Sequence, residues 1–294
     1  VSHTCVPPVA AILRTGATPV LVDVDPDTQT MDPRQAERAI TERTRCILPV
    51  HLYGQCADLT ALGDLASSRD LHLVEDCAQA HGAEHRGGMA GSFGTAGCFS
   101  FYPTKNLGAF GDGGMVVTEE EGLAEELRRI RFYGYASNQT AVRSGYNSRL
   151  DTLQAAVLQV GLGRLSEWNS KRRDWARKYL EGIGDGLVGT PSEASGNRHV
   201  YHLFVVRSLE RRRVREGLEK RGIETAIHYP VPVHRQVGYG EHCRVGPGGL
   251  EVTERLSSEI FSLPLYPYLS EQEFERVIQA LESLGADQRP SIER

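Results

Sequence analysis

The sequence predicts an α/β fold in which helices cover a mostly parallel sheet, followed by a smaller α+β domain at the C-terminal end. Two observations support this prediction. In the first half of the chain, short apolar runs alternate with helical segments, which is typical of a parallel sheet with helices on both faces. After a polar loop at 189–197, the order of strands and helices changes. The expected strands of the large domain are 19–23, 46–51, 71–75, 97–101 and 114–118.

Helix signals lie between these strands. Asp32 and Pro33 supply an N-cap and a first-turn proline for a helix that continues to residue 40. Further helices are expected at 58–69 and 119–131. Since ligands of such sheets bind beyond the carboxyl ends of the strands, the side chains that follow the strands are the first candidates for chemistry.

A long helical pattern at 150–180 is predicted to bridge two domains, because its apolar residues recur mostly at i+3 and i+4. Near the end of the chain, a capping box at 270–273 starts a last helix that ends near Gly285. We therefore expect a large domain at 1–149, the bridging helix at 150–180 and a small domain at 181–294. The other expected elements of the small domain are a strand at 201–206, a helix at 211–221 and a strand at 225–228.

The composition argues against several classes of protein. The 294 residues carry a net charge of -5 without a basic stripe, so nucleic acid is not an expected partner. The longest uncharged run, 87–104, is interrupted by glycine, serine and proline, so no membrane helix is expected. The six cysteines form no C-x-x-C pair, so no metal site is expected. Free thiols of this kind suit the cytoplasm.

Two residues carry the strongest functional signal. Asp76 directly follows one expected strand, and Lys105 lies in a glycine-rich loop after another. A lysine that forms a Schiff base and an aspartate that pairs with a pyridinium nitrogen are the groups that a pyridoxal phosphate enzyme needs. Ser100 can donate its hydroxyl to a phosphate, and Gln79 can hydrogen-bond the ring's 3-oxygen. From the residues alone, Lys105 also fits a surface lysine, and Asp76 also fits an N-cap.

Two other segments give weaker signals. Asn147 and Arg149 precede the long helix, where backbone amides and the helix dipole favour anions. His228, Tyr229 and His234 lie close together in a proline-rich segment, which makes them candidates for substrate binding. The same histidines equally fit a buried strand end in which their hydrogen bonds are satisfied.

Almost the whole chain resembles the DegT/StrS family of sugar aminotransferases. This resemblance implies the aspartate-aminotransferase-like fold, which is fold type I of the pyridoxal phosphate enzymes, and it implies pyridoxal 5′-phosphate as the cofactor. The segments that carry the resemblance include the Glu-Asp-Cys-Ala-Gln stretch around Asp76 and the Ser-Phe-Tyr-Pro-Thr-Lys-Asn stretch that ends after Lys105. The matching segments are 16–25, 51–55, 75–82, 100–106, 147–156 and 227–230.

The resemblance also implies roles for individual residues. Lys105 is then the Schiff-base lysine, Asp76 the partner of the pyridinium nitrogen and Gln79 the contact to the ring oxygen. Ser100 binds the cofactor's phosphate. Asn147 reaches the phosphate held by the partner subunit, so the resemblance implies a homodimer with shared active sites.

The chain departs from the family pattern near its start. Many members have an aromatic residue that stacks on the cofactor ring in the segment that matches 2–8, whereas Cys5 follows Thr4 here. Pro7 and Pro8 replace small residues. The family's phosphate-gripping turn would precede Val1, so we expect the chain as given to bind the cofactor more weakly than a version extended at its start.

The expected activity is transfer of an amino group from an amino acid, with L-glutamate as the expected donor, to a keto group of a nucleotide-linked deoxysugar. Two alternatives stay open. One is a pyridoxal-phosphate-dependent sugar dehydratase or deaminase, although the family's C3-dehydratase type has a histidine where this chain has Lys105. The other is a non-catalytic binding or sensing protein that keeps the fold.

Overall fold

The computed structural model describes residues 1–137, 140–184 and 186–286. Its main sheet has the order β2-β3-β6-β7. The β2–β3 and β3–β6 pairs are parallel, and the β6–β7 pair is antiparallel, so the expected α/β class with a mostly parallel sheet is confirmed. The strands of this sheet are β2 (Cys46–Ile47), β3 (His72–Asp76), β6 (Ala96–Ser100) and β7 (Gly114–Val117).

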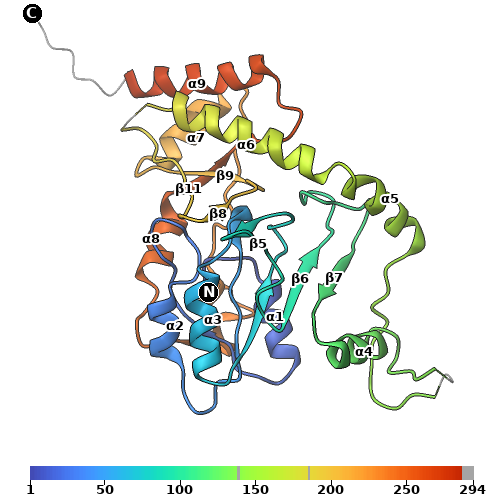
Figure 1. Ribbon diagram of the computed structural model, residues 1–294. Helices are drawn as coiled ribbons and strands as arrows, with labels where there is room; N and C mark the ends of the chain where they lie inside the picture. The colour runs from blue at the N-terminus through green and yellow to red at the C-terminus, as the bar shows by residue number, and fades with distance from the viewer. Residues whose placement is uncertain (138–139, 185, 287–294) are drawn as a thin grey trace, which may run out of the picture.

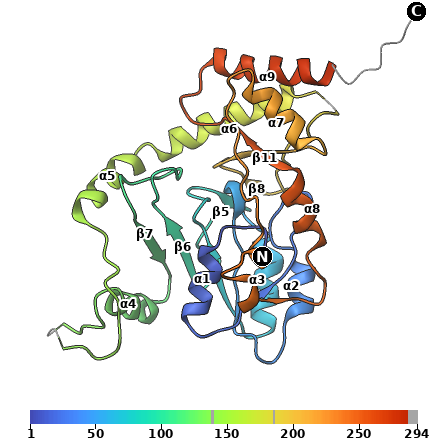
Figure 2. The ribbon, with the colours of Figure 1, turned by 180° about the vertical axis from the view of Figure 1, so that it is seen from behind.

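Helices lie on both faces of the main sheet. In Figure 1, α3 lies in front of the strands, and in the reverse view of Figure 2, α1 lies in front of them. Proline at the first turn and an Asp32 side chain that accepts from the Arg34 amide start α2 as expected. The helices of this half are α1 (Pro7–Arg14), α2 (Pro33–Ala39), α3 (Leu59–Ser68) and α4 (Glu121–Ile130), with the short η1 (Leu52–Gly54).

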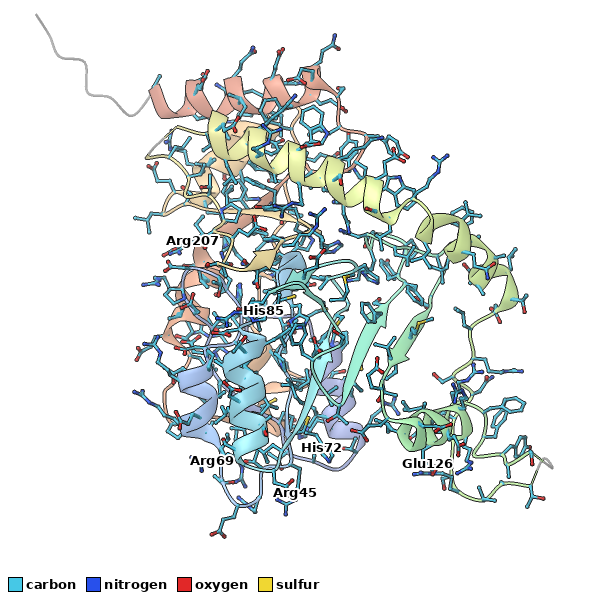
Figure 3. The ribbon with its side chains drawn as sticks, viewed as in Figure 1. Arg45, Arg69, His72, His85, Glu126 and Arg207 are labelled. Atoms are coloured by element: carbon cyan, nitrogen blue, oxygen red, sulfur yellow. The ribbon has the colours of Figure 1, made fainter. Side chains whose placement is uncertain are left out.

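Asp76, the candidate partner of the cofactor ring, lies at one of the two ends of the main sheet. Arg45 and His72 lie where β2 and β3 begin, and Figure 3 shows them with Arg69 at one edge of the molecule. Asp76 lies at the other end of β3, where the chain turns into the segment that carries Gln79. Since β2, β3 and β6 run parallel, their carboxyl ends meet on this side.

The second half begins with α5 (Thr152–Leu162) and α6 (Leu165–Gly182). Beyond them, β9 (Phe204–Arg207) pairs antiparallel with β11 (Ile260–Leu263), and this ribbon packs with the last helices around buried Tyr179, Phe204 and Phe261. The remaining helices are α7 (Arg211–Glu219), η2 (Val233–Arg235), η3 (Gly240–His242), α8 (Glu251–Glu259) and α9 (Glu271–Ala286). Residues 287–294 of the expected small domain lie outside the described residues, and the domain limits stay a prediction.

Short strands join the two halves of the chain. The expected strand 19–23 is not part of the main sheet, because β1 (Val20–Leu21) pairs instead with β10 (Arg244–Val245), which lies far along the sequence. Likewise β4 (Glu84–His85) pairs with both β5 (Gly88–Met89) and β8 (Asn197–Arg198). The periodicity of an apolar run indicates a strand but does not identify its partner.

Two other expectations were wrong in detail. The helix expected at 150–180 is broken between α5 and α6, where Gly161 and Gly163 lower the helix propensity. The strand expected at 225–228 is reduced to a single bridge between Ala226 and Ser262. The prolines that follow this segment lack the N–H group that a longer ladder needs. None of the helices in the described ranges combines the length and hydropathy needed to span a bilayer.

Candidate active site

The main sheet places Asp76 and Ser100 on the same face. Asp76 is paired with Cys98 across the β3–β6 ladder, and Ser100 lies two residues further along β6. Because side chains alternate along a strand, all three point to the side that α1 covers. There they line a cavity of about 230 Å³ that also includes Pro7 and Pro8 of α1.

The Asp76 carboxylate has unused hydrogen-bonding capacity. Its Oδ1 accepts the backbone N–H of Ala78 at 3.0 Å, which is its only hydrogen bond within the described ranges. Burial raises the pKa of Asp76, while the hydrogen bond from Ala78 and the charges of His51 and Lys105 oppose this rise. A carboxylate has about four acceptor positions, so Asp76 can accept a further charged N–H group from a ligand in the cavity.

Lys105 lies near enough to this carboxylate for their charges to interact. Its loop leaves β6 and is closed by a hydrogen bond from the Lys105 amide to the carbonyl of Tyr102 at 2.9 Å. Burial lowers the pKa of Lys105 below its ordinary value of 10.5, and the charges of Asp76 and Cys5 counteract this effect. A lysine in this setting is an amine that gives up its proton more readily than a surface lysine does.

Gln79 connects the Asp76 turn to the segment that was expected to bind substrate. Its Oε1 accepts from the Tyr53 amide at 2.6 Å, and its Nε2 donates to the Tyr229 hydroxyl at 3.0 Å. The Tyr53 hydroxyl in turn donates to the carbonyl of His228. Gln79 therefore has one amide hydrogen left for a ligand.

The two candidate histidines have different surroundings. His228 Nδ1 lies 2.9 Å from Ser262 Oγ, and burial and the charge of Lys105 lower the pKa of His228. His234 lies between Ser2 Oγ at 2.8 Å and the Glu254 carboxylate at 3.1 Å. His228 is thus near Lys105, whereas both ring nitrogens of His234 are used in contacts to other parts of the chain.

Asn147 and Arg149 do not join this cluster within the chain. Both are exposed, and they contact each other through Arg149 Nε and Asn147 Oδ1 at 2.9 Å. Asn147 forms a bridge with Phe132, and the Arg149 guanidinium lies 5.5 Å from the ring centre of Phe132. The nearby ion pair between Glu126 and Arg143 ties their loop to α4, where Figure 3 places Glu126.

Three residues near Lys105 were missed as candidates by sequence reasoning. His81 has two buried ring nitrogens without a partner in the described part of the chain, and burial and Lys105 lower its pKa to about 4. Burial and Lys105 also lower the pKa of His202 well below the usual range. Cys5 lies near enough to affect the pKa of both Lys105 and Tyr229. The sequence did offer a signal for His81, because this residue lies in the segment 75–82 that carries the family resemblance.

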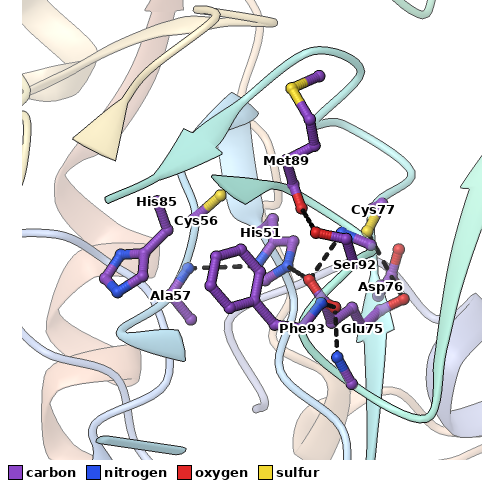
Figure 4. Close-up of polar contacts among 12 residues, drawn as sticks. His51, Cys56, Ala57, Glu75, Asp76, Cys77, His85, Met89, Ser92 and Phe93 are labelled. Carbon is purple, nitrogen blue, oxygen red and sulfur yellow. Dashed lines mark hydrogen bonds and ion pairs between the residues drawn. The ribbon is translucent and has the colours of Figure 1, made fainter. Parts of the chain in front are cut away.

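His51 and Glu75, whose side chains are buried, form a hydrogen-bonded pair next to Asp76 of β3 (Figure 4). The Ala57 amide donates to His51 Nδ1, so Nε2 carries the proton and donates to Glu75 at 2.9 Å. Burial raises the pKa of Glu75, but the hydrogen bond and charge of His51 and the amides of Gly91 and Gly94 lower it overall.

His51, Glu75 and Cys77 lie close enough together to resemble metal ligands. The His51 nitrogens and the Glu75 oxygens are already hydrogen-bonded, and burial strongly raises the pKa of the Cys77 thiol. This cluster therefore has a structural role at the base of Asp76.

A larger cavity of about 280 Å³ lies elsewhere, around His85 and Asn197. Its central histidine is already hydrogen-bonded, with Nε2 2.8 Å from Thr60 Oγ1 and Nδ1 2.7 Å from Asn197 Oδ1. Because Asp76 lines the smaller cavity and its charge interacts with that of Lys105, we place the candidate active site at Asp76 and Lys105.

Comparison with known proteins identifies the family of the chain. A family model described as the DegT/DnrJ/EryC1/StrS aminotransferase family matches residues 1–282. The chain belongs to this family. The expected family, fold class and enzyme class are thereby confirmed.

Individual members of the DegT/DnrJ/EryC1/StrS family resemble the chain closely. It is 48% identical over 291 residues to dTDP-3-amino-3,4,6-trideoxy-alpha-D-glucose transaminase from Micromonospora megalomicea subsp. nigra, covering 96% of this chain and 76% of that protein. A solved structure of S. venezuelae DesV in complex with a ketimine intermediate is 46% identical and has a TM-score of 0.92, covering 96% of this chain and 76% of that one. NtdA from Bacillus subtilis, solved with bound PMP, is 30% identical with a TM-score of 0.86, covering 96% of this chain and 66% of that one.

Proposed function

We propose that the protein is a pyridoxal-phosphate-dependent aminotransferase that moves an amino group from an amino acid, with L-glutamate as the expected donor, to a keto group of a nucleotide-linked deoxysugar. The observation that carries this proposal is a lysine of lowered pKa whose charge interacts with a buried carboxylate that forms no salt bridge within the described residues. The transaminase name of the Micromonospora relative supports the substrate class.

The residues present fit the cofactor. Asp76 offers a carboxylate oxygen to a ring N–H, and Gln79 has one amide hydrogen for a ring oxygen. Ser100 Oγ accepts from the Tyr102 amide at 3.3 Å, which leaves its hydroxyl hydrogen for a phosphate. When bound, pyridoxal 5′-phosphate supplies an aldehyde carbon for Lys105 and an electron-withdrawing ring.

The chain's own part in the reaction is to move a proton. Released Lys105 Nζ, as a neutral amine, removes the proton from the donor's Cα. In the reverse half of the cycle, the same amine returns a proton to the sugar carbon that bears the new amino group. Asp76 stabilises the transition state because its negative charge holds the proton on the ring nitrogen. Arg149, His228, Tyr229 and His234 are proposed to contact substrate.

The pH dependence of Lys105 can be tested without turnover. We expect pyridoxal 5′-phosphate to condense with cofactor-free protein at a rate that rises with pH through a midpoint below 10.5, because only the neutral amine reacts and burial lowers the lysine pKa. Asp76→Asn should move the midpoint further down, since the lost negative charge no longer favours the ammonium. Initial rates of borohydride-trapped adduct across the pH range measure this. An upward movement in Asp76→Asn would contradict the electrostatic contact.

We further propose that the active unit is a homodimer with shared sites. Asn147 and Arg149 are exposed and lie outside the Lys105 cluster of their own chain. Large apolar side chains on α5 and on the loop after Lys105 are also open to solvent, with Phe110 84%, Leu153 73% and Val160 72% exposed. The Phe110 amide donates to Gln154 Oε1 of α5 at 2.8 Å, so Phe110 lies against the helix that carries Leu153 and Val160, and a second copy would cover these apolar side chains. The six free thiols support a cytoplasmic location.

Mixed dimers test the shared site. Lys105→Ala subunits and Asn147→Ala subunits are each expected to give weakly active or inactive homodimers. After exchange, a mixed dimer has one site with both Lys105 and Asn147, so activity should recover to roughly one quarter of the parent. Turnover is measured before and after exchange, which is followed with differently tagged subunits. Exchange without any recovery would show that each site is built from a single chain.

A further inference from the structure

A buried pair of amide side chains lies directly behind the Lys105 loop. Asn106 follows Lys105 and is 5% exposed, and Asn169 on α6 is 3% exposed. Asn106 Nδ2 donates to Asn169 Oδ1 at 2.9 Å, and Asn169 Nδ2 donates to the carbonyl of His81 at 2.8 Å. Asn169 is therefore bonded to two segments of the site at once, namely the Lys105 loop and the turn that carries Gln79.

The hydrogen bonds determine the orientation of both amides. Asn106 Nδ2 also donates to the carbonyl of Val200 at 3.2 Å, so its nitrogen and oxygen cannot be exchanged without losing two bonds. If the nitrogen and oxygen of the Asn169 amide were exchanged, its NH₂ group would face the NH₂ group of Asn106. Its oxygen would then face the carbonyl oxygen of His81. Asn106 Oδ1 then accepts from His202 Nδ1 at 3.1 Å, which leaves the neutral His202 with an unprotonated Nε2.

The surroundings leave Asn169 little room to move. A Cβ atom on Gly82, whose φ is +79°, would come within 2.7 Å of Asn169 Nδ2. One turn further along α6, Arg172 donates to the carbonyls of Tyr201, His202 and Leu265 at 3.1 to 3.3 Å. The helix is thus fixed to the chain segment next to His202, and Asn169 holds the two site loops against that helix.

We propose that Asn169 is a positioning residue for the amino-transfer reaction, which keeps the Lys105 loop and the Gln79 turn at a fixed separation through Asn106 and the His81 carbonyl. This inference rests on the proposed function. Loss of the Asn169 amide frees Lys105 Nζ from its fixed place relative to Asp76 without removing any group that touches the substrate. Misplacement of a reacting group by about 1 Å can cost on the order of a hundredfold in rate.

The test uses Asn169→Ala and Asn169→Asp, with Tyr179→Phe as the matched control. Asn169→Asp keeps the volume and the acceptor for Asn106 but loses the donor to His81. Tyr179 lies on the same helix, is fully buried and donates to the carbonyl of Pro264 at 2.9 Å, away from Lys105. Three quantities are measured for each protein: the melting temperature, the rate of pyridoxal 5′-phosphate adduct formation at Lys105 in the cofactor-free protein, and kcat with KM.

We expect both Asn169 variants to slow adduct formation and lower kcat by about tenfold or more, with little change in KM for the sugar. Tyr179→Phe should lower the melting temperature similarly and leave both rates within about twofold of the parent. Asn106→Ala is measured as well, and the double variant Asn106→Ala/Asn169→Ala should be no slower than the slower of the two single variants, because either one already breaks the contact between the two amides.

Three results would overturn the positioning role. The first is an adduct rate and a kcat near those of the parent in a folded Asn169 variant. The second is a double variant in which the losses of rate multiply. The third is failure of both Asn169 variants to fold, which would make the residue a determinant of general stability. The adduct assay also separates this inference from the proposed function. If the parent itself is labelled at another lysine, the site assignment fails first.

Discussion

Replacing Lys105 by alanine is expected to abolish amino transfer, with a loss on the order of a thousandfold or more. The lysine has two tasks, covalent attachment of the cofactor and proton transfer at the donor's Cα, and it is the lysine whose charge acts on Asp76. The chain has only four lysines, and the others are Lys171 and Lys178 on α6 and Lys220 at the end of α7. Borohydride reduction followed by peptide mapping, together with turnover, measures both tasks.

Two controls make this result specific. Lys105→Arg keeps the positive charge beside Asp76 but cannot form the adduct, so it should be as inactive as Lys105→Ala. Lys220→Ala removes an exposed lysine and should retain the activity of the parent. Label on Lys171, Lys178 or Lys220 in the parent protein, or substantial turnover by Lys105→Ala, would show that the reactive amine lies elsewhere.

Asp76→Asn is expected to bind cofactor and to turn over on the order of a hundredfold more slowly, which corresponds to about 3 kcal/mol of transition-state stabilisation. An amide of the same shape still fits beside Ala78 and Cys98, so the cavity should keep its form. The amide cannot hold a proton on the ring nitrogen, because it has no negative charge. Cofactor affinity by absorbance titration and kcat for both proteins measure the two effects separately.

Asp76→Glu is the matched control, since it keeps the charge but moves it by one methylene group. It should be more active than Asp76→Asn if charge is the decisive property. Near-parental kcat in Asp76→Asn would mean that another group protonates the ring or that the protonation is not needed. Loss of cofactor binding along with activity would instead point to a role in binding.

The strongest site signals were readable from the sequence because they are local. Asp76 ends β3 and Lys105 follows β6, and the strand periodicity places them at the same edge of a parallel sheet. The family resemblance added the role of Asn147, and the roles of Gln79, Ser100 and Asn147 stay predictions. Asp76 and Ser100 indeed line one cavity, whereas Asn147 lies on an exposed loop.

Features that depend on distant partners could not be predicted in this way. Asn106 and Asn169 are 63 residues apart, and Asn106 and His202 are 96 apart, so no spacing rule connects them. An asparagine in a helix also resembles a solvated residue until its buried partners are known. For the same reason, the pairing of β1 with β10 was missed, since tertiary contacts decide it.

The fate of the donor's nitrogen tests the proposed activity most directly. Cofactor-loaded protein is incubated with L-glutamate whose amino nitrogen carries a heavy isotope, together with a panel of dTDP- and UDP-linked keto-sugars. The products are then analysed by mass spectrometry. We expect one of the sugars to gain the labelled nitrogen in place of its keto oxygen, with an equal amount of 2-oxoglutarate formed from the donor. An unlabelled dehydrated sugar, released ammonia, or no product with any member of the panel would contradict amino transfer to a nucleotide-linked sugar.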